Sequence, residues 1–283
     1  MQLKRKTEKK LKREEKFSSL DITYEEEHAL AWYRMNAHPR PCLTKELIDE
    51  AQAWFNQITG EESCNYKLEY MVMSSKVPGV FNLGGDLNLF IQLIRDKNKE
   101  ALLKYDIACI ETMYRIHRGL EKDVTSIALV QGDALGGGFE GVLANDVIIA
   151  EKSAKMGLPD ILFNLFPGAG AYSFLSRKVG AALAEEMVLS GKLYTAQELY
   201  DLGIVNVLVE DGEGEQAVYD YIKKESRQRN GRIGFRKVKK LNNPVTLEEL
   251  IDGAKIWADA AMNLEDKDLR MMERLVKRQS ARY

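Results

Sequence analysis

The sequence predicts an α/β protein with a helical region after its core. Between residues 66 and 210, strand patterns alternate with helix patterns, which is typical of α/β folds. Beyond about residue 211 the apolar periodicity is helical. Hydrophobic residues make up 45% and charged residues 30% of the 283 residues, so the chain can bury a sizeable core.

The chain is expected to begin with a basic N-terminal arm over residues 1–18, because Met1–Lys16 carries eight Lys or Arg against three Glu. A solvated terminus is typical of such a charge run, and an arm that binds a polyanion is the alternative. Residues 19–60 are predicted to form a helical leader. Thr44 can cap a helix with apolar residues at the helical period, and Gly60 follows as a stop.

Residues 61–210 are predicted to form the core, and residues 211–283 a helical C-terminal region. The core begins with a strand at Tyr66–Met73 and continues through a glycine turn to a long helix at Glu100–Arg118. The later core elements are expected as strands within Asp123–Val130, Asn145–Asp160 and Gly203–Glu210 and as a short helix within Gly168–Gly180. Two C-terminal helices fit Leu247–Met262 and Glu265–Gln279, the first opened by a capping box at Thr246–Glu249.

Composition and charge limit the function classes. Three cysteines lie far apart, which excludes a full disulfide framework and suits a reducing cytoplasm. Three histidines without a close cysteine or histidine partner give no pattern for a metal site. No apolar run reaches the roughly 18 residues that a membrane span needs, and the net charge of −2 gives no strong attraction to nucleic acid or membrane. A cytoplasmic protein without a metal is therefore expected.

The segment QGDALGGGFEG at Gln131–Gly141 is the most informative stretch. Gly136, Gly138 and Gly141 match the G-x-G-x-x-G fingerprint of dinucleotide sites. Two observations disfavour that interpretation: five residues separate the predicted strand from the first glycine, and Glu140 would repel bound phosphates. The alternative is that the glycine amides donate hydrogen bonds to a ligand oxygen that approaches the backbone closely.

A second glycine turn, NLGGDL at Asn82–Leu87, follows another predicted strand. Two such turns can each contribute one N–H to a thioester oxygen and so form an oxyanion hole. Glu140 and Asp160 could then act as acid and base on the atoms beside that carbonyl. Tight turns with solvated acids remain the alternative, and spacing alone does not decide between the two.

Three segments resemble the crotonase (enoyl-CoA hydratase/isomerase) superfamily: FNLGGDL, VQGDALGGGFEGVLANDVIIAEKSAKMGLPDILFNLFPGAGAYSFL and SGKLYTAQELYDLGIVNVLV. Within it, LGGGFEG, MGLPDILFNLFPGAGAYSFL and the leader LAWYRMNAHPRPCLTKELID are most similar to diffusible signal factor synthases of the RpfF type. The resemblance implies a ClpP/crotonase-like spiral of strand-strand-helix repeats with a helical C-terminal region. It also implies a homotrimer or a dimer of trimers.

The resemblance also implies the site residues. The oxyanion-hole amides correspond to Gly85 and Gly137, and the two catalytic acids to Glu140 and Asp160. The family has Glu where this chain has Asp160, whose carboxylate reaches about 1.5 Å less. A misplacement near 1 Å can cost about 10²-fold in rate. Three outcomes are open: the backbone compensates, a water molecule bridges the gap, or one of the two activities is weak. We favour the first two, because the flanking residues keep the family pattern.

The implied activity is dehydration of a 3-hydroxyacyl chain on acyl carrier protein, followed by hydrolysis of the 2-enoyl thioester. The product would be a cis-2-unsaturated fatty acid that acts as a quorum-sensing signal. No cofactor is implied beyond the phosphopantetheine that carries the substrate, and a regulatory sensor protein is a further implied partner. An enoyl-CoA hydratase/isomerase of fatty acid metabolism is one alternative, and a non-catalytic binding or regulatory protein of the same fold is another.

Two groups of residues are expected around the substrate. The acyl chain is predicted to contact Gly136, Phe139, Leu162, Phe166 and Trp257, for which ordinary core packing is the alternative. An acidic carrier protein needs a basic docking surface, and Lys223–Lys240 holds nine cations against one acid. Within this segment the docking residues are predicted to be Arg232, Arg236 and Lys237, with a solvated surface as the alternative.

Overall fold

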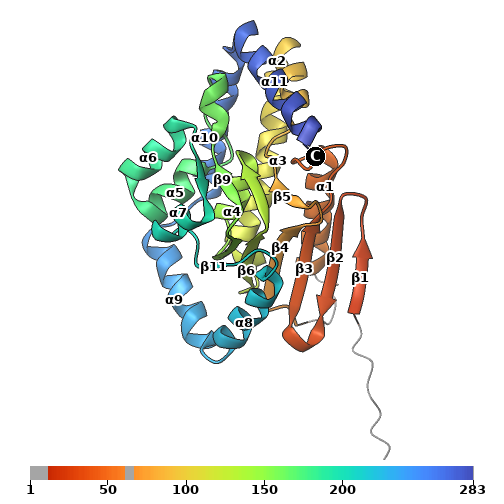
Figure 1. The fold of residues 1–283 in the computed structure, drawn as a ribbon, viewed down its shortest axis with the longest axis vertical. Helices are drawn as coiled ribbons and strands as arrows, with labels where there is room; N and C mark the ends of the chain where they lie inside the picture. The colour runs from red at the N-terminus through yellow and green to blue at the C-terminus, as the bar shows by residue number, and fades with distance from the viewer. Residues whose placement is uncertain (1–11, 61–66, 283) are drawn as a thin grey trace, which may run out of the picture.

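Two β-sheets form the centre of the molecule in the computed structural model, which describes residues 12–60 and 67–282 (Figure 1). The seven-stranded sheet has, in spatial order, β1 (Lys12–Lys16), β2 (Leu20–Glu25), β3 (Leu30–Met35), β4 (Tyr70–Ser75), β6 (Thr125–Val130), β8 (Val147–Glu151) and β11 (Val207–Val209). The four-stranded sheet has β10 (Leu193–Thr195), β9 (Lys155–Gly157), β7 (Gly132–Leu135) and β5 (Gly79–Asn82).

Strand pairs repeat along the chain in a spiral. The pairs β4–β5, β6–β7 and β8–β9 each place their first strand in the large sheet and their second in the small one, and helices follow each pair. The strands from β3 to β11 in the large sheet, and β5, β7 and β9 in the small one, are parallel. Parallel strands are covered on both faces, which explains why β6 and β8 are buried at every position. The predicted α/β spiral of strand-strand-helix repeats is confirmed.

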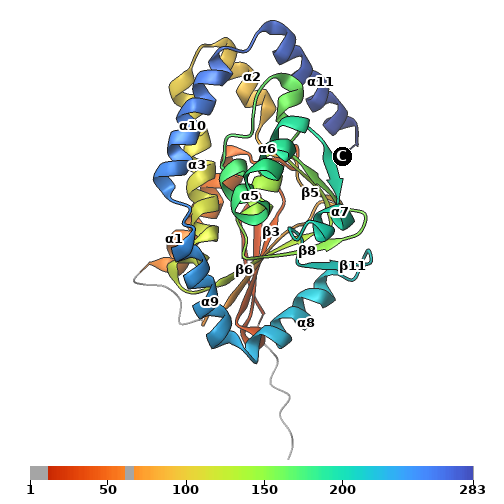
Figure 2. The same ribbon diagram turned by 90° about the vertical axis from the view of Figure 1, so that its left-hand side faces the viewer.

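Eleven helices cover the sheets within the described residues: α1 (Lys45–Thr59), α2 (Leu87–Arg95), α3 (Lys99–His117), α4 (Gly137–Leu143), α5 (Ala171–Val179), α6 (Ala181–Ser190), α7 (Ala196–Asp201), α8 (Gly214–Ser226), α9 (Arg229–Asn242), α10 (Leu247–Met262) and α11 (Asp266–Arg282). Three 3-10 turns join them, η1 (Glu26–His28), η2 (Gly119–Glu121) and η3 (Pro159–Phe163). The predicted helical C-terminal region is confirmed. Its α10 packs along α3 and its α11 against α2, although these helices are far apart in sequence (Figure 2).

The helical leader predicted for residues 19–60 is wrong in its first half. Residues 20–35 contain β2 and β3 instead, and β2 alternates buried and half-buried positions as a strand does. Because β3 pairs with β4, the leader and the core share one sheet. The predicted boundary at residue 61 therefore does not separate two structural units. The second half of the prediction is confirmed, since the Thr44 hydroxyl caps α1 and Gly60 follows it. In the predicted basic arm, residues 12–16 form β1, and residues 1–11 lie outside the described part.

Candidate active site

Two glycine turns meet at one edge of the small sheet. Strands β5 and β7 are parallel neighbours, so the loops that follow them emerge side by side. Gly84 has a φ of +88°, and a Cβ there would lie 2.6 Å from the carbonyl oxygen of Leu135. A Cβ on Gly138 would lie 2.1 Å from the carbonyl oxygen of Asn82. Glycine is therefore required at both positions for the turns to approach each other.

The glycine run follows a strand directly, contrary to the sequence analysis. Residues Gly132–Leu135 form β7, and Gly136 comes next with a φ of +50°. The spacing argument against a dinucleotide site is therefore wrong. Glu140 still disfavours a bound phosphate, because its side chain is buried beside the glycine run and its ionised form would repel an anion there.

The two predicted oxyanion-hole amides lie next to each other. A Cβ on Gly137 would be 3.4 Å from the nitrogen of Gly85. Gly137 is the first residue of α4, so its N–H has no acceptor within the helix. Neither amide donates a hydrogen bond to another group in the described part of the chain. Two free, adjacent N–H groups are the arrangement that stabilises a negatively charged oxygen.

The Gly85 turn is held by residues that the sequence analysis did not select. Asp86 caps α2, forms an ion pair with Arg40 and donates its backbone N–H to the Tyr105 hydroxyl at 3.1 Å. That hydroxyl donates in turn to the carbonyl oxygen of Leu43, whose own N–H donates to the oxygen of Gly84 at 2.7 Å. The Pro-Arg-Pro segment of the leader (residues 39–41), the Leu43 that follows it and α3 thus fix the position of the Gly85 amide.

Glu140 is a buried carboxyl group on α4, with 2% of the residue exposed. One of its oxygens accepts a hydrogen bond of 2.9 Å from the backbone N–H of Ala171 at the start of α5. Burial raises the pKa of Glu140 well above its ordinary value, and the nearby carboxylates of Asp160 and Asp106 raise it further. A carboxyl group of this kind can hold a proton at neutral pH and release it to a substrate.

Asp160 faces the start of the same helix from η3. A Cβ on Gly136 would lie 3.4 Å from Asp160 Oδ2 and 3.6 Å from its Oδ1. Oδ2 is buried and has no hydrogen-bond partner. Burial raises the pKa of Asp160 to about 6. The two predicted acids are therefore brought to the same few residues of α4 that carry the free Gly137 amide.

A third carboxyl group, Asp106 of α3, stands at this site and was not predicted. The residue is 5% exposed, and its Oδ2 is buried without a hydrogen-bond partner. Burial, and then the charge of Asp160, raises the pKa of Asp106 to about 7. The sequence carried a signal for it, because Asp106 lies on the apolar side of the predicted helix, between Leu102 and Cys109.

The raised pKa values predict a pH-dependent stability. The folded protein holds protons that the unfolded chain releases above about pH 4, so the stability from this source is complete below that pH. It is lost as the pH rises through about 6 for Asp160 and about 7 for Asp106. For Asp106 the difference between about 7 and 3.8 corresponds to about 4 kcal/mol.

Urea unfolding at pH values from 4 to 8 measures this effect. We expect Asp106→Asn to be relatively more stable than the unmodified protein at pH 8 than at pH 4, because only the unmodified protein carries the acid. A difference between the two proteins that does not change with pH would contradict the assignment of a raised pKa to this group.

The predicted acyl contacts are spread over several environments. Phe139 is fully buried in the main core, Phe166 is half-buried and Leu162 is 52% exposed. Trp257 of α10 is buried, and its Cγ lies 2.8 Å from the position that a Cβ on Gly168 would take. Gly136 turns toward Asp160, but its N–H already donates to the carbonyl oxygen of Gly157.

An apolar cavity of about 30 Å³ lies between α4, the strands β3, β4 and β5, and the helices α1 and α3. Gly137, Gly138 and Gly141 form its wall on the α4 side, so it adjoins the oxyanion hole. Cys109 and Met113 of α3 lie opposite. The five predicted acyl contacts are not among its lining residues.

The predicted docking residue Arg236 is half-buried, and its charge is already paired with a buried carboxylate. Its guanidinium donates to the buried carboxylate of Glu225 at 2.7 Å and to the Thr125 hydroxyl at 2.6 Å. The prediction for Arg236 is therefore corrected, because a change there would leave a buried charge unpaired. Lys237 is 61% exposed and pairs with Asp123, and Arg232 contacts Gln228 on the same helix.

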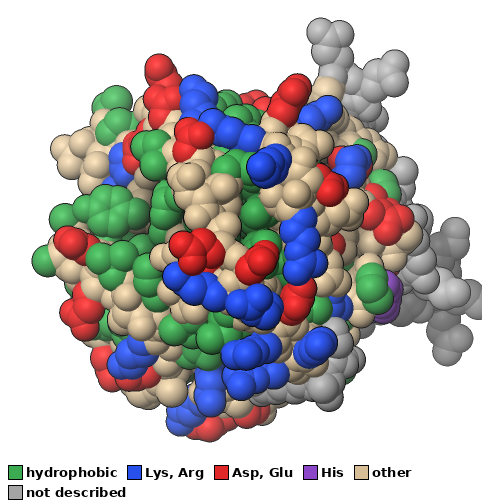
Figure 3. Space-filling model, turned by 90° about the horizontal axis from the view of Figure 1, so that it is seen from above, with side chains coloured by type: hydrophobic (Ala, Val, Ile, Leu, Met, Phe, Trp, Pro, Cys, Tyr) green, Lys and Arg blue, Asp and Glu red, His purple; other side chains and the backbone are tan. Residues whose placement is uncertain are grey.

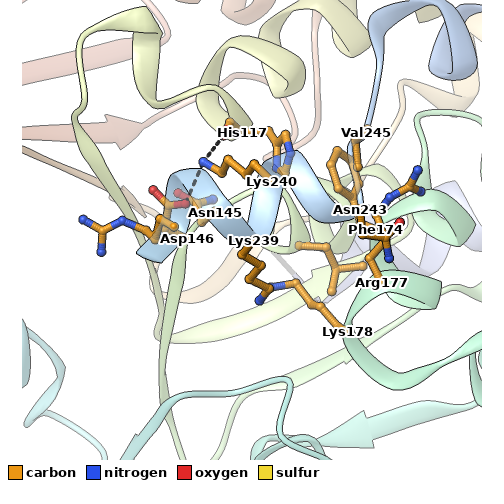
Figure 4. Close-up of a pocket in the computed structure, with 12 residues that line it drawn as sticks. His117, Asn145, Asp146, Phe174, Arg177, Lys178, Lys239, Lys240, Asn243 and Val245 are labelled. Carbon is orange, nitrogen blue, oxygen red and sulfur yellow. Dashed lines mark hydrogen bonds and ion pairs between the residues drawn. The ribbon is translucent and has the colours of Figure 1, made fainter. Parts of the chain in front are cut away.

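A separate basic pocket of about 90 Å³ lies between α5 and α9 (Figure 4). Lys240 bonds Asp146 and the carbonyl oxygen of His117, so its charge is compensated. The ammonium groups of Lys178 and Lys239 point toward one another, and burial together with this neighbour lowers the pKa of Lys178 to about 8. The pocket lies at the C-terminal end of α5, whereas the buried acids face its N-terminal end.

Neither a metal site nor a membrane span is found in the part of the chain that the structure describes. Over residues 12–60 and 67–282, no three histidine, cysteine or acidic side chains are placed to hold a metal ion. Over the same ranges, no helix is both long and apolar enough to cross a bilayer.

Comparison with known proteins finds a matching family and several relatives. The family model described as enoyl-CoA hydratase/isomerase matches residues 25–279. The human mitochondrial enoyl-CoA hydratase domain-containing protein 2 is 35% identical over 158 residues, which are 54% of this chain and 50% of that protein. The chain spans about half the length of the curated relatives it matches.

Solved structures share the fold. An enoyl-CoA hydratase from Geobacillus kaustophilus superposes with a TM-score of 0.71 at 22% identity, covering 94% of this chain and 97% of that one. DspI from Pseudomonas aeruginosa gives a TM-score of 0.66 at 25% identity, covering 80% of this chain and 87% of that one.

Proposed function

Because the chain belongs to the enoyl-CoA hydratase/isomerase family, we propose that it performs acid–base chemistry on an acyl thioester, adding water across the C2–C3 bond or removing it. The observation that carries this proposal is the pair of free amides at Gly85 and Gly137, beside which lie the buried carboxyl of Glu140 and the half-buried Asp160, whose Oδ2 is buried. A polarised carbonyl, a base and an acid are what such a reaction requires.

In the proposed mechanism the thioester oxygen accepts hydrogen bonds from Gly85 and Gly137, which stabilise the negative charge that develops on it. During dehydration one carboxylate takes the proton from C2, and a protonated carboxyl gives a proton to the hydroxyl that leaves from C3. Hydration is the reverse. The raised pKa values of Glu140 and Asp160 suit this exchange, since each group can hold or release a proton near neutral pH.

Hydration of 2-enoyl-CoA thioesters of increasing chain length tests the proposal. We expect loss of the conjugated enoyl absorbance and formation of the 3-hydroxyacyl-CoA. A folded protein that turns over none of these thioesters, whether carried on CoA or on acyl carrier protein, would support a non-catalytic binding protein instead.

Synthesis of a diffusible signal factor is the second candidate. It requires the same oxyanion hole in a further step, in which water attacks the thioester carbonyl and the thiol leaves with a proton. Two observations favour it: the Pro-Arg-Pro leader packs onto the Gly85 turn, and an apolar cavity adjoins Gly137. Mass spectrometry of the products from 3-hydroxyacyl carrier proteins separates the candidates, because only the synthase releases a free unsaturated fatty acid.

Gly141→Val tests the cavity as the acyl-chain site. A Cβ on Gly141 would lie 3.2 Å from Met73 Cε and 3.9 Å from Met113 Cε, so a larger side chain would fill the space. We expect kcat/KM to fall by about tenfold or more for long-chain thioesters and little for crotonyl-CoA. The reciprocal change Met73→Ala should favour longer chains. An equal loss for all chain lengths would place the acyl chain elsewhere.

Docking of an acidic carrier protein is retained as a proposal for Arg232 and Lys237. The double change Arg232→Glu and Lys237→Glu is expected to raise KM for carrier-bound substrate by about five- to tenfold and to leave KM for acyl-CoA unchanged. Lys267→Glu is the control, because Lys267 is 66% exposed on a different helix, α11. Equal changes in the two KM values would argue against docking at α9.

The proposal extends to self-association into a homotrimer or a dimer of trimers. Exposed large apolar side chains come from the segment that runs from η3 to the residue after α7: Leu162, Tyr172, Leu189, Leu193, Tyr200 and Leu202. Helices α5, α6 and α7 of this segment lie at the left of Figure 1. Figure 3 shows apolar side chains gathered on the same side of the molecule. Exposed apolar surface of this kind favours contact with another protein surface. Sedimentation equilibrium measures the state of association directly.

A further inference from the structure

We propose that Asp106 is a third acid–base residue of this active site and works together with Asp160 on the oxygen atom at C3 of the substrate. The inference deepens the proposed function and rests on it. It starts from a juxtaposition of three carboxyl groups from three separate elements, Asp106 of α3, Glu140 of α4 and Asp160 of η3.

Asp106 lies about one turn before the residues of α3 that line the apolar cavity. Asp106, Cys109 and Met113 are spaced so that they share one face of α3, and the latter two line the cavity. At the other end, Asp106 Oδ2 lies 3.0 Å from the position that a Cβ on Gly168 would take. A side chain at Gly168 would therefore press against this carboxyl group, and the glycine leaves the space beside it free.

A purely structural role does not account for this side chain. Buried carboxyl oxygens in folded proteins are almost always hydrogen-bonded, and one without a partner destabilises the fold. Asp106 Oδ2 and Asp160 Oδ2 both lack a partner, so two such atoms stand at one site. In contrast, the buried Asp268 accepts hydrogen bonds from the backbone N–H of Glu265 and from Asn164. Unsatisfied acceptors next to free amide donors are expected where a polar substrate completes the bonding.

The groups that face Asp106 from the surrounding elements favour a shared proton. Glu140 and Asp160 are acidic, Cys109 lies one turn further along α3, and α10 contributes the ring of Trp257. Three carboxyls this close do not all ionise together, so their protons belong to the cluster rather than to one residue. Asp106 has a raised pKa, which allows it to be a proton donor near neutral pH.

A second acid from α3 would compensate for the short side chain at residue 160. Asp160 is one methylene shorter than the glutamate that the family resemblance leads us to expect, and Asp106 approaches from the α3 side. In dehydration, one carboxylate of the cluster gains the proton from C2, while Asp106 or Asp160 gives a proton to the 3-hydroxyl, which leaves as water. The cluster ends the reaction with the number of protons it had at the start.

Asp106→Asn tests the proposal, because it keeps the shape and removes the acid. We expect kcat for hydration of crotonyl-CoA to fall by about 10²-fold, KM to change by less than about threefold, and one ionisation to disappear from the pH–rate profile. In this background Asp160→Glu should recover at least about tenfold of the lost kcat, because the longer acid reaches further. Asp268→Asn is the matched control and should leave the pH profile unchanged.

An Asp106→Asn enzyme with an unchanged kcat and pH profile would overturn the inference. Carboxyl ¹³C NMR of the unmodified protein gives a test that does not depend on activity or on a variant that folds. The Asp106 and Asp160 signals should shift when a 3-hydroxyacyl-CoA thioether, which cannot be hydrolysed, binds. A bound ligand that leaves the Asp106 signal unmoved contradicts its role. Failure of every thioester to react would instead reject the proposed function, whatever the NMR signals of Asp106 and Asp160 show.

Discussion

Glu140→Gln is expected to lower kcat by about 10³- to 10⁴-fold while the protein stays folded. Glutamine has the same shape, and its amide oxygen can accept the N–H of Ala171 as the carboxylate does. What is lost is the proton that the buried acid holds or accepts. Steady-state hydration of crotonyl-CoA gives kcat, and circular dichroism reports the fold.

Glu151→Gln is a matched control for this change. Glu151 is also a buried glutamate that accepts a backbone N–H, from Gly214 at 3.1 Å, and it also accepts a hydrogen bond from Gln131. It lies on β8, outside the carboxyl cluster. We expect a loss of stability there without a large loss of kcat. A Glu140→Gln protein that turns over at the unmodified rate would refute the mechanism.

Gly137→Ala should lower kcat by about 10²- to 10³-fold, the effect of losing one oxyanion-hole donor. The added methyl group would lie 3.4 Å from the Gly85 nitrogen and 3.0 Å from Leu43 Cδ1, which blocks the thioester oxygen from the two amides. Gly137 does not have a positive φ, so alanine at this helix start causes no backbone strain, and only the end of the Leu43 side chain has to shift slightly. The loss should appear in kcat more than in KM, because the hole binds the transition state.

Gly253→Ala is a control for the effect of replacing a helical glycine by alanine away from the site. Gly253 lies within α10, and a Cβ there meets no atom within 4 Å. Alanine should stabilise the helix by roughly 0.5–1 kcal/mol and leave kcat unchanged. If Gly137→Ala reacted as fast as this control, the thioester oxygen would not sit between the two glycine amides.

Elements with local signals could be predicted from the sequence. Helix α10 has the predicted bounds, and α1 begins after Thr44 and ends before Gly60, because caps and helical periodicity are read within a few residues. Strand β2 lies ahead of α1 and has no such local signal. Alternate burial of Leu20 and Ile22 depends on pairing with β3, and the sequence does not display which strands pair.

The candidate site likewise contains residues that local motifs predict and residues that they do not. Its glycines and Glu140 lie in two short motifs that follow β5 and β7, so the sequence places them together. Asp106, Arg40 and Tyr105 come from segments at least 25 residues away from the Gly137 motif. Only the packing of α3 and the leader against the two turns brings them in, and this packing is not encoded in a local pattern.

The position of Trp257 has a consequence for when this site comes into being during synthesis. Its indole ring packs at Gly168 beside Asp106, and it also contacts Phe90 of α2. The ribosome releases α10 well after every strand of both sheets has been made. Since domains assemble as their segments emerge, the nascent chain can form its sheets before Trp257, which packs beside Asp106, has been made. The acid cluster therefore becomes enclosed, and acquires its raised pKa values, only after α10 has been made.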